Sequence, residues 1–591
     1  MSLMRHGNSS PAGTLPRLMS DHNGVRPEGT MRERRMRRRA LVAFAWPILV
    51  GAAVSAGAAG GQHAGRLATA RVQREDGYTA PSNSILESAT NRGSNSRDGW
   101  YPSEPGLLPQ VVGSSQFGQL FATQLNGQIY AQPLLVGRVL FVATETDWIY
   151  GLNPATGAIL WSRHINTAFR DAPLKCGDLV PSLGVTSTPT VDPATGIVYL
   201  VDQAYVGGGI GLFMHAINPA TGAEMSHFPV AINGPVSNNP QQRFRPTKEL
   251  QRAGLLFLHD VIYVAFGSHC DFGPYSGIIV GVSTTGRRTT MWSDEGLGTD
   301  SGGGIWQAGG GLVSDGNNQI LFCSSNGFGS ASHPNGPIPS PSPPANLADS
   351  VVRLVVQSDG SLKATNFFSM SNDSVVDAHN WDLAGSPVAL PPKFSTLKYP
   401  HLLVATGKQG MVYLLNRDSL GGVGEGVGGK DDVLGKYGPI GDTMSTAGVW
   451  PGDGGYVYVA TVDGGFGKAG QLYAYKFATS NGVPSLRPVG TGSQHTVFGV
   501  SGPLITSVGM TTGSAVVWIV NGSSLQAYDP VPLSGKLTLL GTWAIGNTDP
   551  FTPPGIGHNV VYVSNQDGVV RGFGKLSSAG HSRLTPQVKP R

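Results

Sequence analysis

The chain has 591 residues, charged residues make up 13% of it, and its formal net charge is +4. Much of that positive excess lies in the arginine-rich N-terminus, so the remainder is close to neutral and has no basic face of the kind that nucleic-acid-binding proteins carry. The 84 glycines and 42 prolines, beside 40% hydrophobic residues, are typical of many short strands joined by tight turns.

A basic run followed by an apolar run marks the N-terminus. RERRMRRR, residues 32–39, precedes ALVAFAWPILVGAAVSAGAA, residues 40–59. This order, with small residues at the end, predicts a secretory signal; the alternative is a membrane anchor, because about twenty apolar residues can span a bilayer. We therefore assign residues 1–60 to an N-terminal extension with a signal peptide and expect an exported protein, which is periplasmic, cell-surface or extracellular. Membrane contact is expected only if the apolar segment is not cleaved.

Two further segments lie outside the predicted folded domain. Residues 61–114 are polar and carry no clear strand pattern, so we expect an extended lead-in there. Residues 576–591 are expected to form a disordered tail. The domain that remains spans residues 115–575.

One short turn motif occurs three times in this domain. NPATG stands at Asn153–Gly157 and again at Asn218–Gly222, and DPATG stands between them at Asp192–Gly196. Asn or Asp followed by Pro begins a turn, and Gly ends it with a positive φ. Each copy follows one apolar strand and precedes another, so each predicts a hairpin, and their recurrence predicts a repeat fold.

Eight similar strand–turn–strand units follow one another along the chain. A complete unit can be assigned four strands, and Trp161, Trp292 and Trp543 share the position of the last strand. Four strands in each of eight units predict an all-β fold, a single eight-bladed β-propeller of four-stranded blades. One strand of each unit reads VLFVATE (139), IVYLVDQ (197), VIYVAFG (261), QILFCSS (319), HLLVATG (401), YVYVATV (456), AVVWIVNG (515) and NVVYVSNQ (559).

The last unit supplies only three strands and ends near Gly574. QFGQLFATQL, residues 116–125, precedes the first unit and can supply the missing fourth strand. A ring closed in this way has no free sheet edge. We therefore expect one domain closed by an N-terminal strand.

The three cysteines differ in their surroundings. Cys176 and Cys270 are flanked by polar loop residues, and in an exported protein a bridge between them is one expectation. The alternative is a metal site at Cys270 and His269, although adjacent ligands without a second cluster are poor zinc spacing. Cys323 lies in the apolar run ILFCSS and is expected to be a buried small hydrophobe.

The unit that ends in NPATGAILW resembles the tryptophan-docking repeat of the quinoprotein (PQQ) alcohol dehydrogenase-like β-propellers. The resemblance covers residues 115–575, and VAFGSHCDFGPYSG, SGGGIWQAGGG and VVRLVVQSDGSLKATNFFS are most similar to uncharacterised exported bacterial proteins with this repeat. It implies a propeller in which the fourth-strand Trp packs between neighbouring blades. Enzymes and non-enzymatic outer-membrane assembly propellers share the repeat, so the resemblance implies no single function.

One stretch resembles the membrane glucose dehydrogenases of that family more closely. There a Trp-Asp pair is followed by a Lys, at a distance similar to that between HNWDLAGSPVALP (379–391) and GKQGMVYLLNRDS (407–419). The resemblance implies Asp382 as the general base, Lys408 and Trp381 beside the cofactor, and PQQ with Ca²⁺ as that cofactor. A carboxylate can accept the alcohol proton while a cation steadies charge on the reduced quinone. Trp306, in SGGGIWQAGGG, would be an aromatic floor under a planar cofactor.

The chain also departs from this pattern. Ala384 stands where an acidic residue is expected, there is no vicinal cysteine pair, and we recognise no Asn/Glu/Asp set for calcium, so no metal ligand is predicted. Each candidate has an alternative reading: Asp382 as a loop-capping carboxylate, Lys408 as a solvated turn lysine and Trp306 as a packing residue. The sequence therefore does not decide whether the protein binds a cofactor.

Two functions follow from these observations. The first is an exported scaffold that binds a small molecule or a protein at the propeller mouth, with no nucleic acid and with catalysis unproven. The alternative is a PQQ-dependent dehydrogenase that oxidises an alcohol or a sugar, with Asp382 as base and Lys408 on the quinone. Propellers serve many unrelated roles, so the fold does not decide between them.

Overall fold

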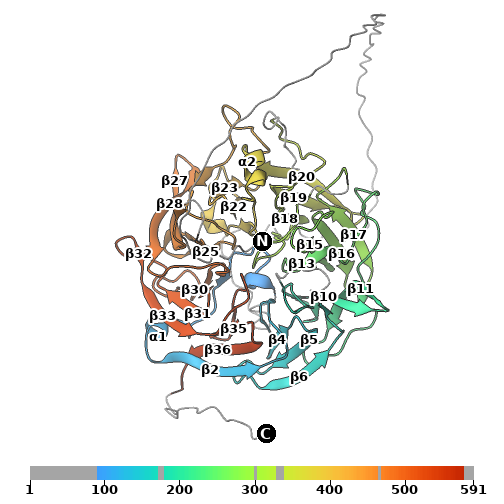
Figure 1. Ribbon diagram of the computed structural model, residues 1–591. Helices are drawn as coiled ribbons and strands as arrows, with labels where there is room; N and C mark the ends of the chain where they lie inside the picture. The colour runs from blue at the N-terminus through green and yellow to red at the C-terminus, as the bar shows by residue number, and fades with distance from the viewer. Residues whose placement is uncertain (1–89, 171–178, 299–301, 328–338, 464–466, 578–591) are drawn as a thin grey trace, which may run out of the picture. The chain divides into compact units, whose positions relative to one another are not determined.

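The computed structural model describes residues 90–170, 179–298, 302–327, 339–463 and 467–577. Within them, eight small sheets follow one another around a ring (Figure 1), which confirms the eight-bladed β-propeller. The predicted signal peptide, the first part of the lead-in and most of the C-terminal tail lie outside the described residues. None of the helices in the described part of the chain is long and apolar enough to cross a membrane.

The first four blades occupy the described residues from 134 to 369. Blade 4 differs from its neighbours because its innermost strand is reduced to a single bridge between Val313 and Leu321. The strands are β3 Leu134–Val136, β4 Val139–Ala143, β5 Trp148–Leu152 and β6 Ile159–His164 in blade 1; β9 Thr190–Val191, β10 Val198–Val206, β11 Gly209–Ile217 and β12 Val230–Ala231 in blade 2; β13 Glu249–Gln251, β14 Leu256–Leu258, β15 Val261–Ser268, β16 Ile278–Ser283 and β17 Arg288–Ser293 in blade 3; and β18 Gln319–Cys323, β19 Ser350–Val356 and β20 Leu362–Ser369 in blade 4.

The other four blades complete the ring. Two of these blades have an additional short parallel edge strand: β32, Lys536–Leu537, in blade 6 and β1, Trp100–Tyr101, in blade 7. The strands are β21 Val388–Ala389, β22 Leu402–Thr406, β23 Val412–Asn416 and β24 Gly435–Tyr437 in blade 5; β25 Gly448–Trp450, β26 Tyr456–Ala460, β27 Leu472–Ser480, β28 Val483–Gly492 and β32 Lys536–Leu537 in blade 6; β1 Trp100–Tyr101, β29 Leu504–Thr506, β30 Val516–Asn521, β31 Ser524–Tyr528 and β33 Leu539–Ala544 in blade 7; and β34 Gly555–Gly557, β35 Val560–Ser564, β36 Val569–Lys575 and β2 Phe117–Gln124 in blade 8.

Short elements lie between the blades. Helix α1, Pro109–Val112, precedes β2, and helix α2, Asp373–Ala378, connects blade 4 to blade 5. A small hairpin of β7, Phe169–Arg170, and β8, Ser182–Leu183, connects blade 1 to blade 2. Three single 3-10 turns lie at Asn91–Gly93, Pro392–Phe394 and Gly452–Gly454.

The ring closes through the N-terminal strand, as predicted. Strand β2 pairs antiparallel with β36, from Phe117 opposite Lys575 to Gln124 opposite Val569. In Figure 1 the blue β2 lies beside the red β36. The N-terminal strand β2 and three C-terminal strands together give blade 8 its four strands, so the ring of blades is closed.

Two copies of the repeated turn contact the preceding blade in the ring. In the second NPATG copy the amide of Gly222 donates to the carbonyl of Asn218 at 2.8 Å, with Gly222 at a φ of +72°. The indole of Trp161, on the last strand of blade 1, donates to the carbonyl of Pro219 in that turn at 2.9 Å. A Cβ on Gly222 would approach the Trp161 ring to 2.6 Å, so the turn needs glycine both for its backbone and for this contact.

The closing strand repeats this contact with a different aromatic residue. Phe121 of β2 lies against Gly157 of the first NPATG turn, where a Cβ would approach the ring to 2.3 Å. Thr123 donates to the Gly157 carbonyl at 2.8 Å. Phe121 therefore takes the role in blade 8 that Trp161 takes in blade 1.

The part of the lead-in that the structure describes fills the centre of the ring. Residues 90–106, which we call the arm, lie in the middle of the ring in Figure 1, in blue. Hydrogen bonds join the arm to all eight blades, although the arm carries no repeat pattern. The contacted residues are, in ring order, Gln132, Thr188, Leu255, Ser314, Ala389, Val449, Ile505 and Asn559.

Two arginines of the arm are completely buried. Arg97 donates to the carbonyls of Leu255 at 2.8 Å and Leu312 at 3.0 Å, in blades 3 and 4. Arg92 donates to the carbonyls of Ala447 at 2.6 Å and Pro503 at 2.9 Å, in blades 6 and 7. Burial lowers the pKa of Arg97 to about 9 and that of Arg92 to about 10, so both stay charged at neutral pH. The two guanidinium groups therefore tie opposite sides of the ring through carbonyl oxygens.

The cysteines fall into two classes. Cys270 is disulfide-bonded, whereas Cys323 is free and buried, as expected for a small core residue. Cys176 lies outside the described residues, so its pairing with Cys270 stays a prediction. A disulfide at Cys270 speaks against a metal site at Cys270 and His269, and among the described residues no group of three or more His, Cys, Asp or Glu side chains is placed to hold a metal ion.

Candidate functional site at the mouth of the ring

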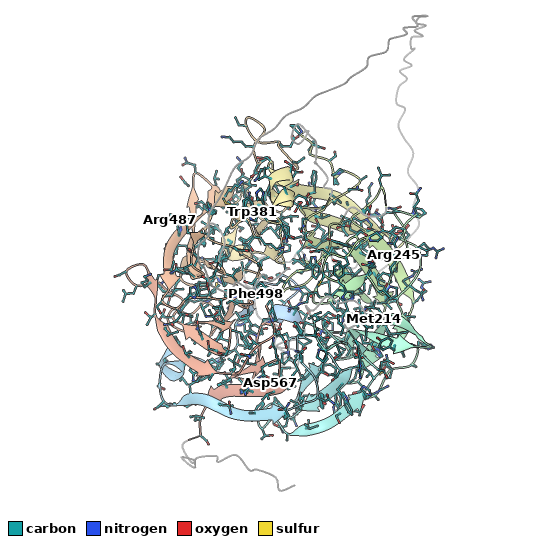
Figure 2. The ribbon with its side chains drawn as sticks, viewed as in Figure 1. Met214, Arg245, Trp381, Arg487, Phe498 and Asp567 are labelled. Atoms are coloured by element: carbon teal, nitrogen blue, oxygen red, sulfur yellow. The ribbon has the colours of Figure 1, made fainter. Side chains whose placement is uncertain are left out.

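Equivalent positions in four successive blades place one set of side chains around the ring axis. Asp382, Asp442, Phe498 and Asp549 each stand six residues before the innermost strand of blades 5, 6, 7 and 8, which begin at 388, 448, 504 and 555. Because the blades are related by rotation about the axis, these residues lie at one end of the ring. We call this end the mouth. Figure 2 shows Phe498 close to the centre of the ring, and its side chain is 49% exposed.

The mouth brings Asp382 and Lys408 into contact. The Lys408 Nζ lies 2.9 Å from Asp382 Oδ1 and 3.1 Å from Oδ2, and it also donates to Asn380 Oδ1 at 2.8 Å. The backbone holds the same two residues together, since the Lys408 amide donates to the Asp382 carbonyl at 2.8 Å. A Cβ on Gly407 would approach that carbonyl oxygen to 2.6 Å, which explains the glycine before Lys408.

The ion pair is largely removed from water. Asp382 is 2% exposed, and the Lys408 side chain is 15% exposed. Burial alone would lower the pKa of Lys408, but the charge and hydrogen bond of Asp382 outweigh it and hold that pKa above its usual range. Lys408 is therefore a firmly charged partner of Asp382 and not a solvated turn lysine.

Further carboxylates surround this pair. Burial, followed by the charge of Asp382, raises the pKa of Asp349 well above its ordinary value; Asp349 is 1% exposed, and neither of its carboxylate oxygens has a hydrogen-bond partner in the described structure. Burial also raises the pKa of Asp442 to about 7, although Lys408 opposes the shift. Asp377 has a raised pKa from burial and from Asp382. Lys408 is thus shared among several acids.

Trp381 lies beside the pair on the connection from α2. Its ring stacks on His379 with centroids 4.4 Å apart and an interplanar angle of 19°. Trp381 also packs against the apolar cluster between blades 4 and 5 that contains Leu383 and Tyr413. Figure 2 shows Trp381 on this side of the ring, so it contacts both His379 and the core of the neighbouring blades.

Trp306 lies in a different environment. It packs against an apolar cluster that includes Phe169 and Leu183 of the β7–β8 hairpin. A Cβ on Gly267 would approach the Trp306 ring to 2.8 Å, so the backbone of blade 3 lies against the indole. Trp306 is partly buried and belongs to a cluster separate from that of Trp381.

These residues can be compared with the needs of a bound quinone of the PQQ type. Such a cofactor is planar and carries several negative charges, so it needs cationic donors and a free aromatic face. Here Lys408 already neutralises Asp382, the carboxyl groups of Asp349 and Asp442 lie near the same pair, and Trp306 is packed against the cluster that contains Phe169. The donor set of the mouth therefore does not fit this cofactor.

Several residues of the mouth were missed from the sequence. Asp442 could have been found, because it stands at the same distance before its inner strand as Asp382 does. Asp349 follows a Pro-rich loop and enters the site only through the fold of blade 4, so no local pattern marks it. Asp549 approaches Arg252 across the ring, and the adjacent Pro550 carbonyl accepts a hydrogen bond from Arg252 at 2.8 Å.

The described fold matches known propellers. The family model for the outer membrane protein assembly factor BamB matches residues 112–332, a little over a third of the chain. The quinohemoprotein alcohol dehydrogenase ADHIIG of Pseudomonas putida HK5 is 13% identical with a TM-score of 0.53 over 85% of this chain and 82% of that one. The quinohemoprotein alcohol dehydrogenase of Comamonas testosteroni is 13% identical with a TM-score of 0.52 over 86% of this chain and 84% of that one. No curated protein matches the chain.

At this level of identity the two dehydrogenases establish the fold and leave activity undecided. The matched residues 112–332 include both NPATG turns, and the second of these accepts the hydrogen bond from Trp161 of the preceding blade. Residues 112–332 therefore match a PQQ-like repeat family model, and the chain as a whole has the fold of the PQQ-like β-propellers.

Proposed function

We propose that the protein is a binding propeller that holds a small molecule or a segment of another protein at its mouth, without quinone chemistry of its own. The mouth offers the half-exposed Phe498 beside a largely acidic set of side chains. An aromatic face next to carboxylates suits neutral polar or basic groups. It does not suit a polyanionic cofactor.

The observation that carries this proposal is the ion pair between Asp382 and Lys408. A general base must be free to take a proton from a substrate, and a cation that serves a quinone must be free to contact it. The pair is joined at 2.9 Å, is largely buried and is fixed by a backbone hydrogen bond between the same residues. Releasing either side chain for chemistry would leave the other as an unpaired buried charge, which is costly.

Export is part of the proposal. The N-terminal sequence has the pattern of a secretory signal, and the disulfide at Cys270 is a bond that persists in oxidising compartments outside the cytosol. The family model that matches residues 112–332 is named for an outer membrane assembly factor, which supports a binding role in that setting. We therefore place the protein in the periplasm, on the cell surface or outside the cell.

Cofactor titration tests the proposal. PQQ with Ca²⁺ is added to the purified full-length protein, and absorbance and intrinsic tryptophan fluorescence are followed together with dye-linked oxidation of alcohols and sugars. We expect no saturable change at stoichiometric cofactor and no dye reduction. Lys408→Met serves as a matched variant, because it removes the cation that pairs with Asp382 and should behave as the parent does in this assay.

The dehydrogenase remains the second candidate, because Asp382 and Lys408, the two residues to which the resemblance gives roles, form an ion pair. It predicts a saturable spectral change that Lys408→Met abolishes, and dye reduction that Asp382→Asn abolishes. Observation of both effects would overturn the binding proposal. A spectral change that both variants retain would indicate adventitious binding elsewhere.

A further inference from the structure

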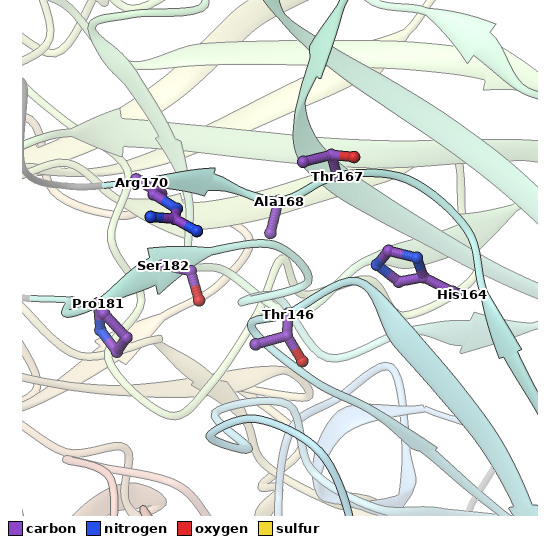
Figure 3. Close-up of a pocket in the computed structure, with 7 residues that line it drawn as sticks. All are labelled: Thr146, His164, Thr167, Ala168, Arg170, Pro181 and Ser182. Carbon is purple, nitrogen blue, oxygen red and sulfur yellow. The ribbon is translucent and has the colours of Figure 1, made fainter.

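A cavity lies away from the ion pair, between the loops of blades 1 and 2. Its volume is about 430 Å³, within the range of roughly 300–1,000 Å³ typical of small-molecule sites. Figure 3 shows His164 at one end and Arg170 and Pro181 at the other. The described residues that line it are Thr146, His164, Thr167, Ala168, Arg170, Pro181 and Ser182.

The frame of this cavity is fixed by backbone hydrogen bonds. The amide of Ile165 donates to the Asp147 carbonyl at 2.9 Å, and the amide of Tyr205 donates to the Thr167 carbonyl at 2.9 Å. Ala168 forms a bridge with Ala204 of blade 2. Both walls of the cavity are therefore anchored to the blades beneath them.

The cationic end of the cavity is built from a cross-strand pair. Arg170 and Ser182 stand directly opposite each other in the β7–β8 ladder, so their side chains share one face. The Arg170 side chain is exposed, and no ion pair to it is found within the described residues. Ser182 is only 8% exposed, and its Oγ has no hydrogen-bond partner in the described structure. A buried hydroxyl without a partner is expected to be satisfied by something that enters the cavity.

The other end of the cavity presents a fixed aromatic ring. His164 and Trp148 are cross-strand partners in blade 1, and their rings stack with centroids 5.0 Å apart at 23°. The stack covers one face of the imidazole and leaves the ring oriented beside the cavity (Figure 3). Between the two ends, Thr146 donates its hydroxyl to the Asn126 carbonyl at 2.8 Å and lies 3.1 Å from the Thr144 hydroxyl, so its oxygen keeps one lone pair to accept from a ligand.

This arrangement selects a ligand class. The hydroxyl groups offer donors and acceptors but no negative charge, the arginine offers a bidentate site for a carboxylate, and the stacked imidazole offers a flat face. We propose that the cavity binds a short acidic saccharide, with its carboxylate on Arg170, its ring hydroxyls on Ser182 and Thr146, and a sugar face against His164. None of the described residues that line this cavity belongs to the Asp382–Lys408 pair, so this proposal does not depend on the function proposed for the mouth.

Titration calorimetry with three probes tests the assignment on the full-length protein. The probes are a glucuronate-terminated disaccharide, its neutral glucose-terminated counterpart, and acetate. We expect the acidic disaccharide to bind about tenfold more tightly than the neutral one, because one charge-assisted pair is lost, and acetate to bind more weakly than either. Arg170→Gln should bring the acidic probe down to the affinity of the neutral one, and Ser182→Ala should weaken both disaccharides.

Arg138→Gln is the matched control, since Arg138 is an exposed arginine at the opposite end of strand β4. It should leave all affinities unchanged, and the melting temperatures of the variants should match that of the parent. Three outcomes would each overturn the proposal: no heat of binding with the acidic disaccharide, equal affinity for the acidic and neutral disaccharides, or unchanged affinity of Arg170→Gln for the acidic probe.

Discussion

The outer ring and the centre of this propeller are specified in different ways. In the outer ring, two contacts between blades repeat a local pattern: Trp161 contacts the turn of the next blade at Pro219, and Phe121 contacts the equivalent turn at Gly157. At the centre, the arm of residues 90–106 contacts all eight blades without any repeat of its own. At the mouth, equivalent positions of different blades likewise carry different residues, as with Asp442 in blade 6 and Phe498 in blade 7. The repeated sequence therefore determines the ring of blades, whereas residues that do not follow the repeat form its centre and the candidate site.

The largest expected effect comes from breaking the centre. Arg97→Ala removes a buried guanidinium that donates to Leu255 and Leu312 and leaves both carbonyls without that donor. Because hydrogen bonds to charged groups are worth more than neutral ones, we expect a loss of about 5 kcal/mol in the free energy of unfolding. Denaturant unfolding followed by circular dichroism measures it, with Arg138→Ala as the exposed control. A loss no larger than the control's would mean that the arm does not hold the ring.

The next largest effect on stability is expected from breaking the ion pair between Asp382 and Lys408 at the mouth. Asp382→Asn or Lys408→Met alone leaves one buried charge unpaired and should cost about 3 to 5 kcal/mol. The double variant removes both charges and should recover a large part of that loss. A double-mutant cycle on unfolding free energies measures the coupling. Additive losses would contradict a stabilising ion pair.

A third effect is a pH dependence at the boundary of blades 1 and 2. Burial lowers the pKa of His215, but hydrogen bonds to Asp202 and Glu224 outweigh it and raise that pKa to about 9. Since this is above the unfolded value of about 6.5, the stabilisation is fully present below pH 6.5 and is lost as the pH rises through 9. It amounts to on the order of 3 kcal/mol. The stability difference between the parent and His215→Gln should therefore shrink between pH 6.5 and 9.5; a constant difference would contradict the charged histidine.

The smallest expected effect is at one repeated contact of the outer ring. Trp161→Ala removes a half-buried indole and its hydrogen bond to Pro219, so we expect a loss of about 2 kcal/mol. Trp161→Phe should lose less, because the ring can still cover Gly222 as Phe121 covers Gly157. Thermal unfolding of both variants checks this order. Equal losses would show that packing of the ring contributes nothing there.

The sequence predicted the outer ring well, because its signals are local. The NPATG turns and the fourth-strand tryptophans each act within one or two blades, and the closing strand could be found by counting the strands of the last unit. The arm could not be found in this way. Arg92 meets Pro503 across 411 residues of sequence, and its acceptors are backbone carbonyls, which no residue pattern identifies.

The candidate site was predicted in part for the same reason. Asp382 and Lys408 lie on one blade, so their spacing carried the information that brings them together. Asp349 and Asp442 come from neighbouring blades, and their effect on the site depends on burial, which only the assembled ring creates. The catalytic and cofactor roles of Asp382, Lys408, Trp381 and Trp306 stay predictions.

Amide hydrogen exchange of the arm tests most directly the claim that the centre of the ring is built by this segment. The amides of Val449 and Ile505 donate to arm carbonyls at 2.8 Å and 2.7 Å, and the Arg92 amide donates to Gln132 at 2.8 Å. In the intact protein we expect peptides that cover 90–106 to exchange as slowly as those of the buried strand β30. Exchange of the arm within seconds, while β30 stays protected, would contradict the account.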